Sequence, residues 1–385
     1  MMSRRPIPSR RPATAYVAVA AVIAAVAVIG WLARSMCAPQ PAPSAAQPAV
    51  RNAWRVVWRA ALTAHANAPV PVDAEGWIVT DDAGGVTRLS DTGKPLWRVS
   101  FSNQPFEASA AIHDRRVFAA STSGGVLALD AETGRALWSV TLDARFQHPP
   151  LLDAQGGGDA AVMRLVSQSD GRLFCLRVRD GLTLWQSEPT NRCDGEPAAG
   201  PYGIAYGNCD GAIHVFDAAD GRRKGSIPVG TEDQMAGGLL SLPDSRLVAG
   251  TRQGNLVVAN AQTFVCEART RVSENEAFLK PVRTQNGLIA TGSEEGLVSL
   301  WFLRDTTLSQ AGEYRFEQAI RDLAACGNRL FILTGGALHI ADTPDAAVCR
   351  VALGDEVYGL ALRDCVTAAC VADGMLVCVK GEAHE

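Results

Sequence analysis

The sequence predicts an all-β protein, an eight-bladed β-propeller with seven blades as the alternative, preceded by one transmembrane helix. Three observations support this prediction. A similar unit recurs at intervals of 38 to 47 residues, each unit contains short apolar strands between turn residues, and an apolar run of 19 residues lies near the N-terminus. Intervals of ~40 to 45 residues are typical of four-stranded propeller blades. We therefore divide the chain into a basic N-terminus (1–14), a membrane segment (15–33), a Pro/Ala-rich linker (34–53) and the propeller (54–385).

The membrane prediction rests on the length and flanks of residues 15–33. As a helix this segment reaches roughly 28 Å, close to the ~30 Å hydrocarbon core of a bilayer. Only Arg34 follows it closely, whereas four arginines precede it: Arg4, Arg5, Arg10 and Arg11. The positive-inside rule then predicts a cytoplasmic N-terminus and an exported propeller, periplasmic in a bacterium or lumenal in a eukaryote.

Processing of the N-terminus has two alternatives. Such a long apolar core favours an uncleaved signal-anchor, although small residues at 42–46 also permit cleavage. Lipidation at Cys37 is disfavoured, because Arg34 and Met36 occupy positions where lipoprotein signals carry a leucine and a small residue. The prolines of residues 34–53 favour an extended spacer.

Composition indicates an ordinary globular protein without a nucleic-acid footprint. Hydrophobic residues make up 47% of the chain, charged residues 20%, and the formal net charge is −4. Neither sign of charge forms a long run beyond the N-terminus, so a basic binding stripe is not indicated.

The repeat is clearest in GGVLALDAETGRALWSV, which begins at Gly124. It contains a strand, a turn between Asp130 and Gly134, and a second strand that carries Trp138. Glycine at a tight hairpin supplies a positive φ at low cost. Similar units begin at Gly84, with Trp97, and at Gly171, with Trp185. Weaker ones begin at Gly211, Gly254, Gly296, Gly336 and Gly374.

The two ends of the repeat region predict how the ring closes. The last unit stops at GMLVCVKGEAHE and lacks a tryptophan strand, whereas AWRVVWRAAL, with Trp58, supplies one before the first unit. We expect this N-terminal strand to complete the last blade, because closure removes exposed sheet edges. The residues expected to dock one blade on the next are Trp58, Trp97, Trp138, Trp185, Gly84, Gly124, Gly134, Gly171 and Gly211.

The pattern in residues 124–138 resembles the PQQ-like propeller repeat, and the resemblance extends over the whole chain beyond the linker. It is specific in the first three units and loose after Gly211, where Gly225 takes the tryptophan place. A WD40 propeller is the minor alternative, because EEGLVSLWFL at 294–303 is similar to a WD40 strand. Length and topology are similar to those of the BamB-like subunits of the outer-membrane β-barrel assembly machinery, which implies an eight-bladed scaffold without quinone.

The sequence gives little support to an enzymatic function. Quinoprotein dehydrogenases of the same superfold resemble each other in a vicinal cysteine pair, and no two cysteines here are adjacent. The six histidines never fall in an H-x-H or H-E-x-x-H arrangement, so a hydrolytic zinc site is not indicated. We predict no cofactor, no metal and no catalytic residue.

The chain has ten cysteines, nine of them after Cys37, and in an exported domain some of these nine should be oxidised. Cys193 and Cys209 flank one blade connection, and Cys370 and Cys378 lie on two arms of an expected hairpin. Each pair could be bridged. The alternative is that these cysteines are small buried strand residues.

Function is expected to be binding, through the loops of one rim. The candidate rim residues are Phe146, His148, Pro149 and Pro150, together with the loop 231–238. We predict a membrane-anchored protein–protein scaffold or accessory subunit of an envelope complex. An extracytoplasmic ligand sensor is the alternative, and a PQQ-dependent dehydrogenase is a less favoured one.

Overall fold

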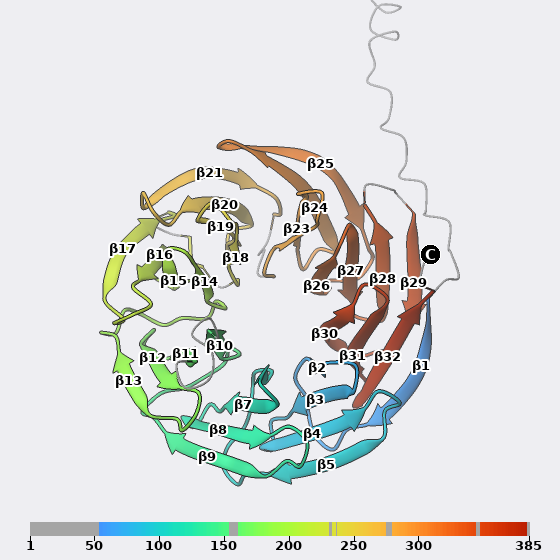
Figure 1. The fold of residues 1–385 in the computed structure, drawn as a ribbon. Coiled ribbons are helices and arrows are strands. Elements are labelled where there is room, and N and C mark those ends of the chain that lie inside the picture. Colours follow the sequence, from blue (N-terminus) through green and yellow to red (C-terminus); the bar gives the residue numbers. More distant parts are fainter. Residues whose placement is uncertain are drawn as a thin grey trace, which may run out of the picture. The chain divides into compact units, whose positions relative to one another are not determined.

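The computed structural model describes residues 54–153, 161–230, 233–235, 237–274, 279–343 and 347–382. These residues form eight four-stranded antiparallel sheets arranged as the blades of a ring (Figure 1). The eight-bladed prediction is therefore confirmed, and the seven-bladed alternative is wrong. The predicted membrane segment and linker lie outside the described residues. Among the described residues, no helix has the length and apolar character needed to cross a bilayer.

The first four blades each use four consecutive strands. Blade 1 contains β2 (Val70–Val72), β3 (Gly76–Thr80), β4 (Gly85–Ser90) and β5 (Pro95–Ser100). Blade 2 contains β6 (Ala111–His113), β7 (Arg116–Ala120), β8 (Gly125–Asp130) and β9 (Ala136–Thr141). Blade 3 contains β10 (Leu151–Asp153), β11 (Val162–Val166), β12 (Leu173–Arg177) and β13 (Thr183–Gln186). Blade 4 contains β14 (Ala198–Gly200), β15 (Gly203–Gly207), β16 (Ala212–Phe216) and β17 (Arg223–Pro228).

Blades 5 to 7 follow the same order, and blade 8 closes the ring. Blade 5 contains β18 (Leu240–Ser241), β19 (Arg246–Gly250), β20 (Asn255–Asn260) and β21 (Val265–Arg271). Blade 6 contains β22 (Val282–Arg283), β23 (Ile289–Gly292), β24 (Leu297–Arg304) and β25 (Thr307–Arg315). Blade 7 contains β26 (Ile320–Cys326), β27 (Arg329–Thr334), β28 (Ala337–Asp342) and β29 (Val348–Ala352). Blade 8 contains β30 (Val357–Asp364), β31 (Thr367–Ala372), β32 (Met375–Gly381) and β1 (Trp54–Ala61).

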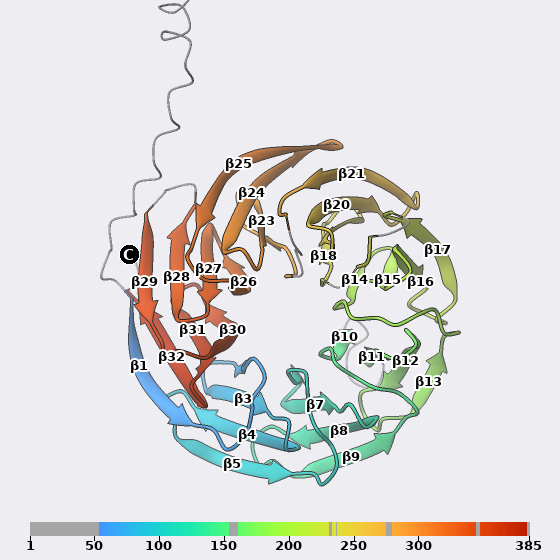
Figure 2. The ribbon, with the colours of Figure 1, turned by 180° about the vertical axis from the view of Figure 1, so that it is seen from behind.

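Closure occurs as the sequence predicted, because β1 is the outer strand of blade 8. It pairs antiparallel with β32, with Trp54 opposite Gly381 and Ala61 opposite Met375. Both views of the ring place β1 beside β32 (Figures 1 and 2). Because this sheet combines strands from both ends of the repeat region, the last blade has all four strands and the ring is closed.

The core lies between adjacent blades. The middle strands are buried on both faces, as in β8, whereas the outer strand β9 alternates between exposed and half-buried residues. One cluster joins Phe118 of blade 2 to Phe174 of blade 3, and Phe146 lies in the same cluster. Each sheet therefore packs face to face on the next.

Turns alternate between the two ends of the ring, because consecutive strands of a blade are antiparallel. We call one end the loop face: it carries the loops that join one blade to the next and the turns between second and third strands. The other end, the turn face, carries the remaining turns. Gly124, on a loop-face turn, has φ +84°, and an added Cβ would lie 2.0 Å from the carbonyl oxygen of Leu142. Gly84, Gly134, Gly171 and Gly211 also have positive φ values.

The disulfide in the described residues joins Cys326 to Cys365, with Cα atoms 5.1 Å apart. Both cysteines lie at first-to-second-strand turns, so the bond links blade 7 to blade 8 on the turn face. This pair was not among the predicted bridges. Blades 7 and 8 also have the longest inner strands of the ring, β26 and β30.

Both predicted disulfides are wrong, because all four cysteines are free. Cys370 lies opposite Val377, one position from Cys378, so the two side chains point to opposite faces of the sheet. The thiol of Cys193 donates to the carbonyl oxygens of Gly195 and Gly207, and that of Cys209 donates to Asp194. Each of these two thiols therefore has its own hydrogen-bond acceptors, and the two are not bonded to each other.

Candidate functional site: the loop face and an interblade groove

The tryptophans of the repeat lie at the seams between blades. Nε1 of Trp138 donates to the carbonyl oxygen of Val178 in the next blade, 3.1 Å away, and the ring lies against Gly181. A Cβ added at Gly181 would come within 2.7 Å of that ring. The same arrangement pairs Trp58 with Asp91 and Gly93, Trp97 with Ala131 and Gly134, and Trp185 with Gly221.

Charged side chains link neighbouring loops on the loop face. Nη2 of Arg145, before blade 3, lies 3.0 and 3.1 Å from the two carboxylate oxygens of Glu107, before blade 2. Nε2 of Gln147 donates to the same carboxylate. The arginine and glutamate side chains keep 44% and 38% of their exposure, so a partner can reach this pair.

Asp194 is the centre of a second polar cluster on the loop face. Its Oδ1 accepts from Nε2 of Gln168 at 2.7 Å and from Nε of Arg192 at 2.8 Å. Arg252 lies 3.8 Å from its Oδ2. Burial alone would raise the pKa of the Asp194 carboxyl, but the hydrogen bonds from Arg192 and Gln168 hold that pKa below its usual value. The carboxylate thus ties the loop before blade 4, which also carries Arg192, to the Gln168 turn of blade 3 and the Arg252 turn of blade 5.

Glu196 continues this cluster across blade 5. Its Oε1 lies 2.7 Å from Nζ of Lys280, in the loop before blade 6. Gly238, before blade 5, lies between them, and its added Cβ would lie 3.0 Å from the Cβ atoms of both residues. Glycine is needed there because the two side chains approach the backbone so closely. The loop face between blades 4 and 6 is therefore a connected polar surface.

The predicted rim residues are less exposed than expected. Phe146 is fully buried and packs edge-on against Phe174, with ring centroids 6.0 Å apart, so its prediction as an exposed contact residue is wrong. Pro150 is also buried, and His148 and Pro149 are half-buried. Burial lowers the pKa of His148, while the carboxylate of Glu196 opposes that shift. The loop folds inward because its aromatic ring fills the space between blades 2 and 3.

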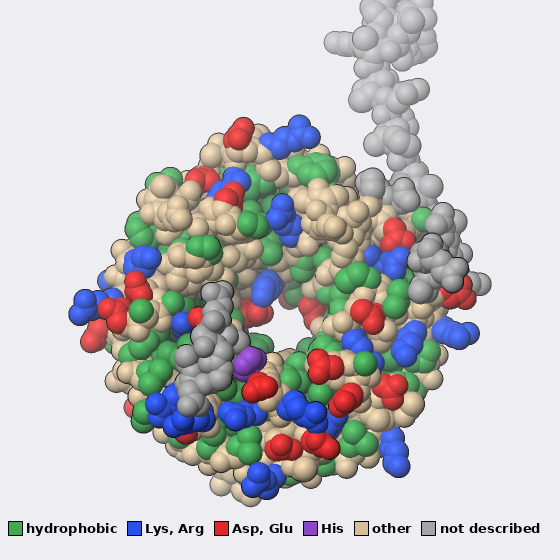
Figure 3. Space-filling view, viewed as in Figure 1, with side chains coloured by type: hydrophobic (Ala, Val, Ile, Leu, Met, Phe, Trp, Pro, Cys, Tyr) green, Lys and Arg blue, Asp and Glu red, His purple; other side chains and the backbone are tan. Residues whose placement is uncertain are grey.

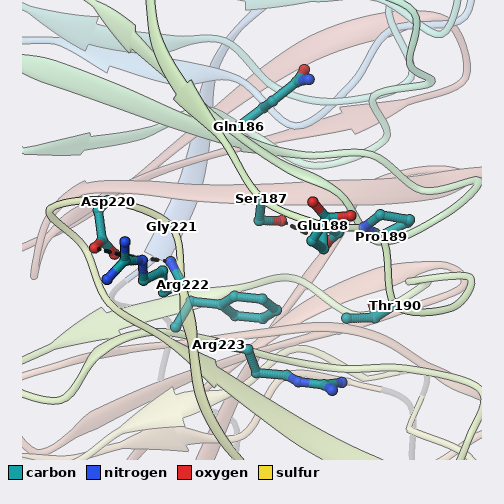
Figure 4. Close-up of a pocket in the computed structure, with 10 residues that line it drawn as sticks. Gln186, Ser187, Glu188, Pro189, Thr190, Asp220, Gly221, Arg222 and Arg223 are labelled. Atoms are coloured by element: carbon teal, nitrogen blue, oxygen red, sulfur yellow. Dashed lines mark hydrogen bonds and ion pairs between the residues drawn. The ribbon is translucent and has the colours of Figure 1, made fainter.

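A groove of about 420 Å³ lies between blades 3 and 4 (Figure 4). One wall is the end of β13 and the segment after it, residues 186–190, and the other is the turn into β17 with its first residue, 220–223. Glu188 and Arg223 lie on opposite sides of the groove, with Thr190 between them in this view. Phe216, which is 1% exposed, also lines it. No sequence motif indicated this groove, because its walls come from different blades.

One arrangement in blade 4 has the residue types of a nucleophile, base and acid. Nδ1 of His214 lies 2.8 Å from Oγ of Ser226, and Nε2 lies 3.0 Å from Oδ2 of Asp210. Burial lowers the pKa of His214, and the carboxylate of Asp210 opposes this shift. His214 and Ser226 are a cross-strand pair and do not line the groove, so their geometry fits a satisfied interior histidine. No group of three metal-binding side chains occurs within the described ranges.

Acidic and basic side chains are intermingled on the face seen in Figure 3, around the central opening of the ring. A large field of one sign is absent from that view. Such a surface fits contacts with a specific partner better than binding to a polyanion.

Eight blades with tryptophans docked on neighbouring glycine turns define the chain as a PQQ-like repeat β-propeller.

The family whose sequence model is described as "Outer membrane protein assembly factor BamB" matches residues 82–305. Because this match covers more than half of the chain, the chain belongs to the BamB family. The resemblance to PQQ-like repeats is thereby confirmed.

Two curated relatives carry the same description. The one from Burkholderia pseudomallei is 25% identical over 152 residues, which are 38% of this chain and 37% of that protein. The one from Salmonella typhimurium is 30% identical over 104 residues, 25% of this chain and 26% of that protein. The matched stretches therefore span well under half the length of these relatives.

Two solved structures show the same fold. The crystal structure of BamB from Moraxella catarrhalis has a TM-score of 0.68 at 20% identity, covering 85% of this chain and 99% of that chain. The computationally designed protein Ika8 has a TM-score of 0.67 at 16% identity, covering 85% and 100%. A designed ring can thus share the architecture, so the fold alone does not define a function.

Proposed function

We propose that this chain is a non-catalytic accessory subunit of outer-membrane protein assembly, acting as a scaffold outside the cytoplasm. The observation that carries the proposal is the BamB family match over residues 82–305. The names of the two curated relatives supply the assembly role. Binding, not chemistry, is the activity that the polar clusters of the loop face support.

The loop face supplies a suitable platform for a protein partner. Arg145 and Glu107 are partly exposed, and the Asp194 and Glu196 clusters hold the neighbouring loops in fixed positions. Preorganised loops lower the entropy cost of association. Trp54, the first residue described, lies at the start of β1 on the turn face, so the chain enters the ring at the end opposite this platform.

The disulfide between Cys326 and Cys365 supports an exported location. Disulfides persist in the periplasm and other oxidising compartments and are rare in the cytosol. We propose a periplasmic propeller held by an uncleaved anchor at residues 15–33, with the N-terminus in the cytoplasm. Fractionation of cells after alkaline extraction would test the anchor, because an uncleaved span stays in the membrane pellet.

Affinity purification of the full-length protein from its native membranes in mild detergent tests the proposed function. Mass spectrometry should identify subunits of the outer-membrane assembly machinery, and the absorption spectrum of the eluate should lack a quinone. A lone protein that carries a chromophore would instead support the dehydrogenase.

A pair of matched variants makes this purification specific to the loop face. Arg145→Glu places like charges beside Glu107 and should abolish co-purification. Arg115→Glu alters an exposed ion pair with Glu132 on the turn face and should preserve it. Equal loss in both variants would contradict a loop-face platform.

A further inference from the structure

We infer that the groove between blades 3 and 4 binds a carboxylate of an extended peptide segment from a protein partner. This assigns a second contact surface, which does not depend on the identity of the proposed assembly complex. The volume of about 420 Å³ is sufficient for a few side chains.

The charges of the groove point to a peptide carboxylate. Arg223 and Glu188 are exposed, and neither has an ion pair or side-chain hydrogen bond within the described part of the chain. The adjacent Arg222 is paired, with Nε 3.4 Å from Oδ2 of Asp220. Arg223 is therefore the guanidinium available to a ligand. A planar guanidinium binds a carboxylate with two parallel hydrogen bonds.

The opposite wall selects against a compact anion. Glu188 faces the groove from the segment after β13, so phosphate bound at Arg223 would meet a second negative charge. A peptide avoids this conflict. Its carboxylate can bind Arg223 while its backbone N–H groups, which lie further along the chain, donate hydrogen bonds to Glu188. The chemistry of the two walls thus fits a chain with separated donors and acceptors.

An extended peptide also matches the free edge beside the groove. β13 is the terminal strand of its sheet, in the order β10-β11-β12-β13, so one side of its backbone has no partner strand within the described blade. Its last residue, Gln186, lines the groove. Peptides commonly bind such edges through main-chain hydrogen bonds, with side-chain contacts that give specificity.

The base of the groove is already ordered. The ring of Phe216 stacks on that of Tyr206, with centroids 5.2 Å apart. The hydroxyl oxygens of Tyr206 and Thr190 lie 3.0 Å apart, and the tyrosine hydroxyl also donates to the carbonyl oxygen of Gly171. A ligand would meet a fixed base, so little affinity is lost to reorganisation there.

Fluorescence polarisation on the full-length protein in mild detergent tests the inference. The probe is a labelled, acetylated and amidated six-residue peptide of serine and valine with one central glutamate. A second probe replaces the glutamate with glutamine, and a third keeps the glutamine but ends in a free carboxylate. Binding of the first probe identifies a side-chain carboxylate, and binding of the third identifies a chain end. The second probe should not bind.

The protein variants connect binding to the groove. Arg223→Gln should weaken binding about tenfold or more, as expected for the loss of a charged hydrogen bond. Arg135→Gln, which removes an exposed arginine from the corresponding turn of blade 2, should change binding by less than about twofold. Glu188→Gln should let inorganic phosphate compete with the peptide more effectively, because the second negative charge of the groove is gone. Unfolding cannot produce such a gain.

Four results would overturn the inference. They are an equal affinity of all three probes, an effect of Arg135→Gln as large as that of Arg223→Gln, displacement of the peptide by inorganic phosphate at a similar concentration, and no binding of any probe. Circular dichroism melting of each variant verifies that the ring remains folded.

Discussion

Replacing Trp138 by alanine should destabilise the ring strongly, because this side chain joins blade 2 to blade 3. A tryptophan buries ~150–250 Å², worth about 4–6 kcal/mol when fully buried. Trp138 is half-buried, so we expect about 2–3 kcal/mol from packing and about 1 kcal/mol from its hydrogen bond to Val178. The expected loss in free energy of unfolding is therefore about 3–4 kcal/mol.

Urea unfolding followed by far-ultraviolet circular dichroism measures this loss. Leu137→Ala is the matched control, because Leu137 is the adjacent residue and is 36% exposed on the outer strand. This control should cost no more than about 0.5 kcal/mol, as surface substitutions usually do. Equal losses in the two variants would refute the docking role of the tryptophan.

A double-mutant cycle with Gly181→Ala isolates the contact itself. Gly181 has φ +73°, and its added Cβ would lie 2.7 Å from the ring of Trp138. Gly181→Ala should therefore cost more with the tryptophan present than with alanine at 138, by about 1 kcal/mol. Additive effects would show that the two residues do not act together.

Three further predictions concern other parts of the ring. Cys326→Ser should lower the free energy of unfolding by up to about 4 kcal/mol, because a disulfide with sequence separation 39 restricts the conformations of the unfolded chain. A melting temperature equal to that of the non-reduced wild type would contradict this. Burial raises the pKa of the Asp322 carboxyl from 3.8 to about 6. The protonated carboxyl therefore contributes up to about 3 kcal/mol to stability below pH 4, and this contribution is lost as the pH rises through 6. Asp322→Asn should flatten the pH dependence of unfolding between pH 4 and 6, and an unchanged slope would exclude this carboxyl. Arg269→Met should cost about 1.5–3 kcal/mol, because it removes a charged hydrogen bond of 2.9 Å to the carboxylate of Asp233, which is 1% exposed. A urea midpoint near that of the wild type would disprove that account.

The ring could be predicted because its determinants are local. Glycine at Gly124 and tryptophan at Trp138 recur with the strand pattern, and each specifies a turn or a seam within one repeat. The closure by β1 followed from the missing outer strand in the last unit. These features depend on short-range backbone geometry and on a period that the sequence displays directly.

The bridges and the rim could not be predicted in the same way. Cys326 and Cys365 are separated by about one repeat and both begin turns, which was the available signal, yet their approach depends on how blades 7 and 8 face each other. Cys370 and Cys378 face opposite sides because of the strand register. Phe146 lies in a long connection that looked exposed, but the space between blades buries it.

The interblade groove had no sequence signal. Glu188 and Arg223 come from neighbouring blades, and each is an ordinary exposed charge in the sequence. Their relation exists only after the outer wall of the ring has formed. Side-chain pairing across a seam thus needs the three-dimensional structure, even where the repeat predicts the seam.

Site-specific photocrosslinking in native membranes tests the central claim most directly. A photoreactive amino acid is placed in the full-length protein at position 145 on the loop face or at position 115 on the turn face, and crosslinked proteins are identified by mass spectrometry. The account predicts crosslinks to outer-membrane assembly subunits from position 145 and not from position 115. Absence of such subunits at both positions, or equal crosslinking from both faces, would contradict it.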